Sequence, residues 1–170
     1  MHTTVAPPKS IGHGKVMPPA ISDRKLLATY LLHMAEKVGA RLRKHHMQAQ
    51  TFFIGFLSDE GFVAHKFKSP RATDDGREIY ALCKIYLNRC WTGWGAHQVQ
   101  VTALDPRPAD TQDDLFLARD ERAARRNAVM DVINARYGEF ALAPAMLLKR
   151  SDMPNVISPA WKPYGHRQTI

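Results

Sequence analysis

This chain of 170 residues has little cysteine and no long apolar run. Its two cysteines, Cys83 and Cys90, lie on one face of a predicted helix, about 10 Å apart along the axis at ~1.5 Å per residue, so they cannot pair without unwinding it. No CxxC pair or His/Cys cluster accompanies them, which predicts reduced thiols in a cytosolic protein. No apolar stretch approaches the ~18 residues of a membrane-spanning helix, and the N-terminus lacks a signal-peptide core.

Arrangements of catalytic groups are also scarce. Two-metal phosphoryl transfer needs several carboxylates that converge in a buried cleft, whereas most acidic residues here lie in one linker, on helix surfaces or in the Asp59-Glu60 turn. The histidines are scattered, and His45-His46 at a predicted helix end suits the helix dipole or a phosphate better than a metal. We therefore predict no catalytic residue, metal site or cofactor in this chain.

Positive charge is abundant, and it is unevenly placed. The net charge is +8, and residues 1 to 72 carry eleven Lys/Arg against four Asp/Glu, whereas residues 105 to 121 carry six acidic residues against Arg107 and Arg119. The basic part fits a polyanion such as nucleic acid, although an anionic membrane surface or plain solubility is also compatible with it. The acidic segment fits a protein partner instead.

Hydrophobic periodicity predicts an α+β fold with the order βαββαβ. The expected elements are a strand at 9–17, a helix capped by Ser22 or Asp23 and ending near Lys44, strands at 50–57 and 62–68, a helix with Asp75 and Glu78 at capping-box spacing and ending near Arg89, and a strand at 97–104. Alternation in the strands predicts one four-stranded sheet with two helices on one face and the other face open.

A helical extension follows the sheet domain. Residues 120 to 137 form a helix in which Val129, Val132, Ile133 and Arg136 share one side that must pack on something, and Gly138 ends it. Residues 141 to 148 are either a strand or a short apolar return that covers this helix. The predicted organisation is a lead-in at 1–8, the sheet domain at 9–105, an acidic linker at 106–119, the helical extension at 120–150 and a proline-containing tail at 151–170.

The open sheet face is the predicted binding surface, because its side chains are not needed for the core. Alternation places Thr51, Phe53, Lys66, Lys68, Gln98, Gln100 and Thr102 on it. The segment from Lys9 to Lys15 adds lysines at both ends and glycines that leave backbone N–H groups accessible to phosphates. The candidate nucleic-acid-binding residues are Lys9, Ser10, Ile11, Gly12, His13, Lys15, Thr51, Lys66, Lys68, Arg71, Gln98 and Gln100.

These patterns together resemble the little-finger domain of Y-family translesion DNA polymerases, the DNA polymerase IV and V group. The resemblance lies in Lys9-Ser10-Ile11-Gly12, the helix ending Ala40-Arg41-Leu42-Arg43, the strand at 50–57, Lys66-Phe67-Lys68, the Thr73-Asp74-Asp75 helix start and the strand with Val99 and Val101. Residues 126 to 138 are similar to an extension that some of these polymerases carry.

The resemblance implies partners for the chain. Gln112-Asp113-Asp114-Leu115-Phe116 looks like a sliding-clamp-binding motif, with Gln112 at the rim of the clamp pocket and Leu115 and Phe116 filling it. Duplex primer-template DNA is the other implied ligand, gripped through its phosphates without sequence readout. The catalytic palm, fingers and thumb, and the Mg²⁺ expected in the palm, would lie before residue 1, so the chain would not polymerise DNA by itself.

Three questions stay open from the sequence. The chain is either a fragment of a polymerase or a free-standing adaptor, and in both cases we expect it in the bacterial cytoplasm, associated with the nucleoid. An RNA-binding module is an alternative, because an exposed Phe53 on a sheet can stack bases. A non-catalytic interaction domain whose charge only keeps it soluble is a further alternative.

Overall fold

A computed structural model describes residues 8–109 and 120–152, and it confirms the βαββαβ order and the α+β class. The elements are β1 (Ile11–Ile21), α1 (Arg24–Lys44), β2 (Met47–Ser58), β3 (Gly61–Thr73), α2 (Gly76–Arg89), β4 (Ala96–Ala103), β5 (Arg107–Pro108), α3 (Glu121–Tyr137) and the 3-10 helix η1 (Ala145–Asp152). The first strand begins and ends later than the predicted 9–17.

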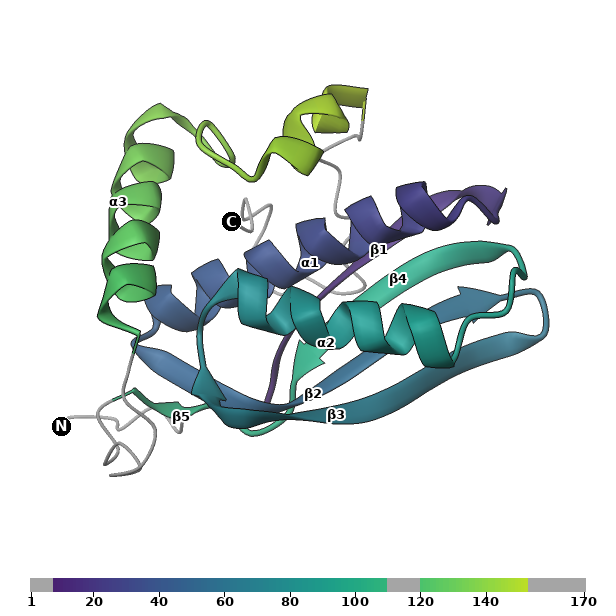
Figure 1. Cartoon of the computed structure of the whole chain (residues 1–170), viewed down its shortest axis with the longest axis horizontal. Coiled ribbons are helices and arrows are strands. Elements are labelled where there is room, and N and C mark those ends of the chain that lie inside the picture. The colour runs from purple at the N-terminus through teal and green to yellow at the C-terminus, as the bar shows by residue number, and fades with distance from the viewer. Residues whose placement is uncertain (1–7, 110–119, 153–170) are drawn as a thin grey trace, which may run out of the picture.

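The antiparallel sheet has the strand order β1-β4-β2-β3, so β1 and β3 are its edges. Figure 1 shows α1 and α2 side by side on one face of this sheet, while no helix of the described residues lies over the other face. One correction concerns the strand count, because the two-residue strand β5 pairs with the start of β2, where Met47 lies opposite Pro108. The sheet therefore has five strands rather than four, and the chain stays on the domain to Ala109.

The apolar stripe of α1 and the inward residues of the strands form the core. Asp23 caps α1 by accepting hydrogen bonds from the backbone N–H groups of Lys25 and Leu26. The core includes five residues of α1, three of β2 and two of β4. They are Leu27, Leu31, Met34, Val38, Leu42, Phe52, Ile54, Phe56, Val99 and Val101. Alternation over residues 52–56 of β2 and 99–103 of β4 points every second side chain into this core, which leaves the others for the open face.

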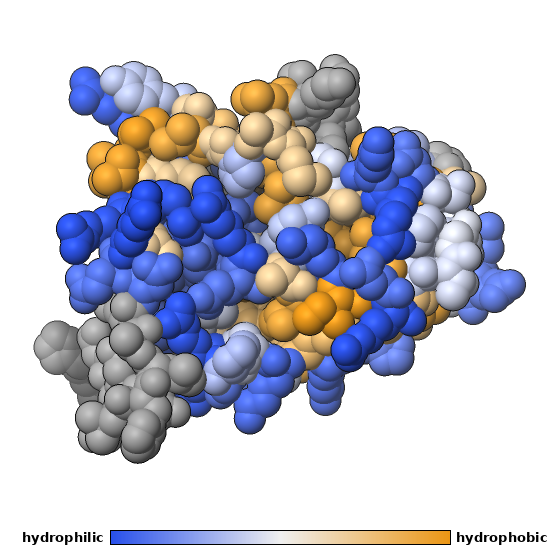
Figure 2. Space-filling model, viewed as in Figure 1, coloured by the Kyte–Doolittle hydropathy of each residue, from blue (hydrophilic) through white to orange (hydrophobic). Residues whose placement is uncertain are grey.

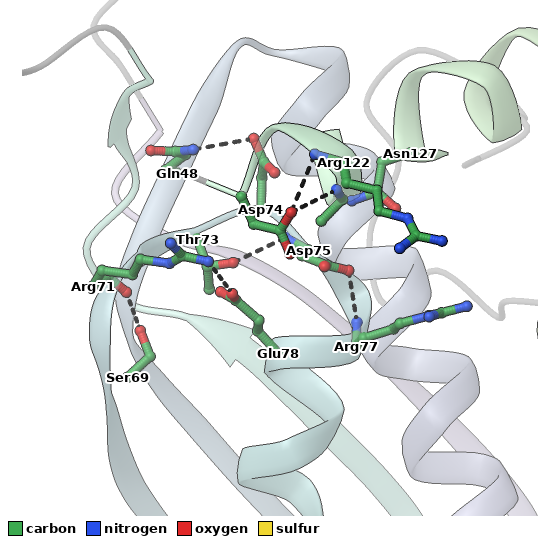
Figure 3. Close-up of polar contacts among 12 residues, drawn as sticks. Gln48, Ser69, Arg71, Thr73, Asp74, Asp75, Arg77, Glu78, Arg122 and Asn127 are labelled. Atoms are coloured by element: carbon green, nitrogen blue, oxygen red, sulfur yellow. Dashed lines mark hydrogen bonds and ion pairs between the residues drawn. The ribbon is translucent and has the colours of Figure 1, made fainter. Parts of the chain in front are cut away.

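Helix α2 begins as predicted, but its capping box is incomplete. The Asp75 side chain accepts from the Arg77 N–H at 3.0 Å, whereas Glu78 forms an ion pair with Arg71 at 2.6 Å instead of returning to the cap (Figure 3). Arg71 at the end of β3 offers Glu78 a charged partner, which outcompetes a backbone N–H. Cys83 is buried in the core and Cys90 is the C-cap of this helix, and both are free thiols.

The orientation of α3 differs from the prediction. Its buried residues are Ala123 and Asn127, whereas Val129 and Val132 are 57% and 68% exposed. Ion pairs decide which side faces the domain, because Asp131 receives two hydrogen bonds from the Arg43 guanidinium at 2.6 and 2.8 Å. The apolar stripe read from the sequence therefore points to solvent.

The segment after α3 is a return, not a strand. Gly138 ends the helix with a φ of 108°, a conformation that favours glycine. The side-chain amide of Asn134 then donates to the Leu142 carbonyl and accepts from the Leu142 N–H. Leu147 is buried, and the Phe140 ring packs edge-on against His33 with centroids 5.0 Å apart, so the return covers α1 and leaves the valines of α3 uncovered.

His13 lies inside the domain, beneath α1. Its side chain is 5% exposed, and its Nε2 atom has no hydrogen-bond partner among the residues that the structure describes. Burial, together with the nearby charges of Lys37 and Arg41, lowers the pKa of His13 from 6.5 to about 3. The folded protein therefore holds this imidazole neutral across the whole range in which an unfolded histidine takes up a proton.

This histidine makes stability depend on pH. The contribution is fully present above pH 6.5 and is lost as pH falls toward about 3, because only the unfolded chain protonates His13 in that window. At pH 5 the loss is about 2 kcal/mol. Urea unfolding of wild type and His13→Gln at pH 7 and pH 5 measures it, and the variant should lose that much less stability on acidification.

A matched control is His45→Gln, which removes an exposed histidine at the end of α1. It should keep the pH dependence of the wild type. An equal loss of stability in wild type and His13→Gln would show that His13 is not the group responsible.

Candidate nucleic-acid interface

The register of the sheet places the predicted open-face residues in rows that cross all four long strands. Gly12, Thr102, Phe53 and Lys66 form one row, since each lies opposite the next across a strand pair. Gly14, Gln100, Gly55 and Ala64 form the next row, and Val16, Gln98, Leu57 and Phe62 form the third. Thr51 and Lys68 lie opposite each other beyond the first row. The structure thus brings the predicted polar residues of three strands onto one surface.

Lys66 and Lys68 are the free cations of this surface. Both are exposed on the edge strand β3, and among the described residues neither has an ion-pair partner. They stand two residues apart on the same face, about 7 Å at ~3.3 Å per residue. Two unpaired ammonium groups at an uncovered sheet edge are available to phosphates.

Arg71 is already ion-paired with Glu78. Its guanidinium donates to Glu78 at 2.6 Å, and this hydrogen bond is the main reason that the pKa of Arg71 is raised (Figure 3). A phosphate would have to compete with an intramolecular carboxylate. Arg71 is therefore a weaker candidate than the two lysines that precede it on β3.

The first strand is divided between the two faces. Gly12 and Gly14 lie on the open face, whereas Ile11, His13 and Lys15 share the helix-covered face with the residues opposite them on β4. Ile11 and His13 are 2% and 5% exposed. Lys15 has the same parity, so the side chains of all three residues point away from the open face and are not brought together with the other candidates. Lys9 and Ser10, just before the strand, are exposed.

Glutamine side chains fill the centre of the face. The Gln100 amide donates to the Thr102 hydroxyl at 2.9 Å. A Cβ atom on Gly14 would lie 2.4 Å from the Gln100 Oε1 atom, so glycine is required for this side chain to lie across β1. Gln98 is half-buried in the neighbouring row. These amide side chains carry no negative charge, so they can donate hydrogen bonds to a nucleic-acid backbone and do not repel it.

An aromatic pair lies beside these glutamines. The rings of Phe53 and Phe62 are 5.9 Å apart at 30° and come from the two outer rows. Gly55 and Ala64, in the row between, leave room for them. Sequence reasoning missed Phe62, although it has the same parity as Lys66 and Lys68 on one strand and alternation alone would have placed it here.

Comparison with known proteins identifies the family. The impB/mucB/samB family C-terminal domain matches residues 8–115. The chain belongs to this family. It is a little-finger domain of the Y-family DNA polymerases, as the sequence resemblance predicted.

Among curated relatives, DNA polymerase IV of Moorella thermoacetica is 33% identical over 143 residues, which cover 82% of this chain and 36% of the relative. DNA polymerase IV of Alkaliphilus oremlandii is 28% identical over 152 residues, covering 82% of this chain and 38% of the relative. The chain thus spans little more than a third of these polymerases. A solved complex of a beta-clamp processivity factor with the little finger domain of PolIV aligns with a TM-score of 0.47 at 14% identity, over 65% of this chain and 98% of that one.

Asp105, just after β4, is held to β2 by three hydrogen bonds. The Asp105 carboxylate accepts hydrogen bonds from the Gln50 N–H, the Thr51 N–H and the Thr51 hydroxyl at 3.0, 2.8 and 3.1 Å. Burial alone would raise the pKa of Asp105, but these hydrogen bonds hold it below its ordinary value. The Thr51 hydroxyl is therefore already engaged by Asp105.

Beyond this point β5 keeps the chain on the domain as far as Ala109, whose N–H donates to the His46 carbonyl at 3.0 Å. The predicted clamp-binding residues Gln112, Leu115 and Phe116 begin three positions later and lie outside the described residues.

Within residues 8–109 and 120–152, no group of three or more His, Cys, Asp or Glu side chains is arranged to hold a metal ion. No helix in that part of the chain is long and apolar enough to cross a membrane.

Proposed function

We propose that this chain is the DNA-binding and clamp-tethering module of an error-prone translesion DNA polymerase that acts in DNA repair and damage tolerance. The open sheet face lies on duplex primer-template DNA, and the linker after β5 docks on a sliding clamp. The observation that carries the DNA part is the uncovered sheet face with Lys66 and Lys68 exposed and unpaired on its edge strand. Family membership supports the same assignment.

The composition of the face favours phosphate contacts over base readout. Sequence readout in the major groove requires a helix or a two-stranded ribbon that enters the groove and presents side chains to base edges. Here the open sheet face offers ammonium groups, glycine backbone and polar side chains, which suit phosphates and sugars. A polymerase that translocates along its template needs such sequence-independent contacts.

The catalytic parts of the polymerase are proposed partners in cis. The palm, with the Mg²⁺ that phosphoryl transfer needs, and the fingers and thumb lie outside the residues of this sequence. The module positions these parts on DNA, and its place of action is the nucleoid in the bacterial cytoplasm.

Clamp binding is proposed for Gln112 to Phe116. The support is the sequence of the motif and its place, three residues after Ala109, whose N–H is bonded to the His46 carbonyl.

Replacement of both lysines tests the DNA interface. Each neutralised phosphate contributes about 0.9 to the slope of log affinity against log salt, so Lys66→Ala with Lys68→Ala should reduce the slope by about 1.8 and weaken binding to all duplex sequences alike. Salt titrations by fluorescence anisotropy measure it.

The matched control removes the same charge from the opposite side of the molecule, in Lys25→Ala with Lys44→Ala, both exposed on α1. It should change the slope much less. Equal effects of the two double variants would mean that only net charge matters and that the open face is not the site.

Phe53 separates duplex DNA binding from single-strand recognition. If its ring stacked on bases, Phe53→Ala would cost roughly 1–3 kcal/mol in binding of single strands. We expect a small effect and little preference for single strands, because the ring already packs against Phe62. Tight binding of single-stranded RNA that is lost in Phe53→Ala would favour the RNA-binding alternative over the DNA module.

The clamp motif is tested by calorimetry with the host's sliding clamp. Leu115 and Phe116 should be the anchors, since burial of each offers about 1.5–3 kcal/mol before ordering costs, and Leu115→Ala with Phe116→Ala should abolish measurable binding. Gln112→Ala should weaken it less, and Asp113→Ala with Asp114→Ala should mainly slow association. Undiminished binding of the Leu115/Phe116 double variant would place the clamp site elsewhere.

A further inference from the structure

A second surface, on the helix-covered side, combines a cavity with uncovered apolar side chains. The cavity has a volume of about 410 Å³ and lies where α1, the start of α2, α3 and the return meet. This volume is within the range of small-ligand and side-chain-binding pockets. Its wall includes Val129 and Met130 of α3 and Leu142 and Pro144 of the return.

The apolar wall is exposed because polar contacts hold α3 in place. Arg43 and Asp131 form a bidentate ion pair, and Arg126 pairs with Asp75 at 2.9 Å. These contacts turn the other side of the helix outward, and Val129 is 57% exposed as a result. Surface helices ordinarily bury their apolar stripe, so a stripe left in solvent beside a cavity marks an interaction site.

The rim of the cavity is cationic. Arg77 has no ion-pair partner among the described residues, and Arg125 has only Glu121, at 3.9 Å, with both side chains more than three quarters exposed. In Figure 2 hydrophilic residues cover the first half of α3, and hydrophobic residues gather at its other end and over the return. A ligand that fills the apolar wall therefore meets arginines at its edges.

One acidic side chain, that of Glu36, lines the cavity. Glu36 is 5% exposed, and no hydrogen bond to its carboxyl group is formed within the described residues. Burial raises the pKa of Glu36, with Asp75 adding to the effect and Arg43, Arg77 and Arg126 opposing it. A carboxyl group with a raised pKa next to an open cavity retains hydrogen-bonding capacity for an incoming ligand.

From these observations we propose that the cavity between α1, α2, α3 and the return binds a segment of a partner protein in which one large apolar side chain is flanked by carboxylates. The apolar side chain contacts Val129 and the wall opposite, while the carboxylates pair with Arg77 and Arg125. DNA fits this site poorly, because an apolar wall offers a charged phosphate no hydrogen bonds in place of its water. The site is on the opposite side of the sheet from the proposed DNA interface, so the two ligands can bind together.

The test uses the whole chain and a short fluorescein-labelled peptide with one central leucine flanked by aspartate and glutamate. Anisotropy should show saturable binding, and a peptide with serine in place of leucine should bind at least about tenfold more weakly, as expected for loss of a buried anchor. No saturable binding of the leucine peptide, or equal binding of the two peptides, would overturn the proposal.

Paired variants locate the site. Val129→Asp should weaken peptide binding about tenfold or more, while Val132→Asp, on the same helix but outside the cavity wall, should stay within about twofold. Arg77→Ala should weaken binding several-fold, and Arg89→Ala, which removes the same charge at the other end of α2, should not. Equal effects within either pair contradict the assignment.

A competition experiment separates this site from the nucleic-acid interface. Duplex DNA at saturating concentration should leave peptide affinity unchanged, and Arg77→Ala should leave DNA affinity unchanged. If DNA displaces the peptide and Arg77→Ala weakens DNA binding, the arginines belong to the nucleic-acid interface and the proposal is wrong. The outcome is independent of whether the clamp motif binds a clamp.

Discussion

The burial of α1 on two opposite sides is the constraint on which the rest of the structure depends. All residues from Leu31 to Gly39 are buried, although a helix on a sheet ordinarily leaves one side in water. The apolar side rests on the sheet, and the other side carries His33, Glu36 and Lys37. Buried charges are costly unless they are paired, and Lys37 finds Glu139 of the return at 3.1 Å. The C-terminal extension therefore completes the helix layer.

The same arrangement keeps the second sheet face free. Every described element after β4 apart from β5 packs on the helix side, so nothing in the described part of the chain covers the rows that contain Phe53, Gln100 and Lys66. The molecule is thus a slab with two unlike surfaces. One is a sheet face on which Lys66 and Lys68 lie beside glutamines and an aromatic pair, and the other is hollowed, with an apolar wall and an arginine rim. Different surface chemistry on the two sides allows two kinds of ligand without competition.

Much of the fold followed from local rules. Alternation in the central parts of β2 and β4 fixes which residues face the core, and Asp23, one of the two predicted caps, begins α1. These features were predicted because each depends on neighbours along the chain. The open-face positions of Lys66, Lys68, Gln98 and Gln100 follow from the same parity. The mistakes share one cause, which is competition from distant partners. Glu78 forms an ion pair with Arg71 instead of completing the capping box. Strand β5 extends the sheet, and the Ala109 N–H that follows it donates to the His46 carbonyl.

By itself, the sequence determined the order of elements, the open sheet face and the family, because periodicity, capping residues and motifs are properties of the chain. Only the tertiary structure decided which side of α3 is buried and which part of the first strand faces outward. The valines of α3 looked like a core stripe, yet the ion pair between Arg43 and Asp131 joins residues 88 positions apart and turns the valines to solvent. His13 looked like part of a phosphate-binding segment, yet strand parity, set by its pairing with Val101, carries it under α1. Long-range pairing energies of this kind leave no local pattern in the sequence, so they become visible only once the chain is folded.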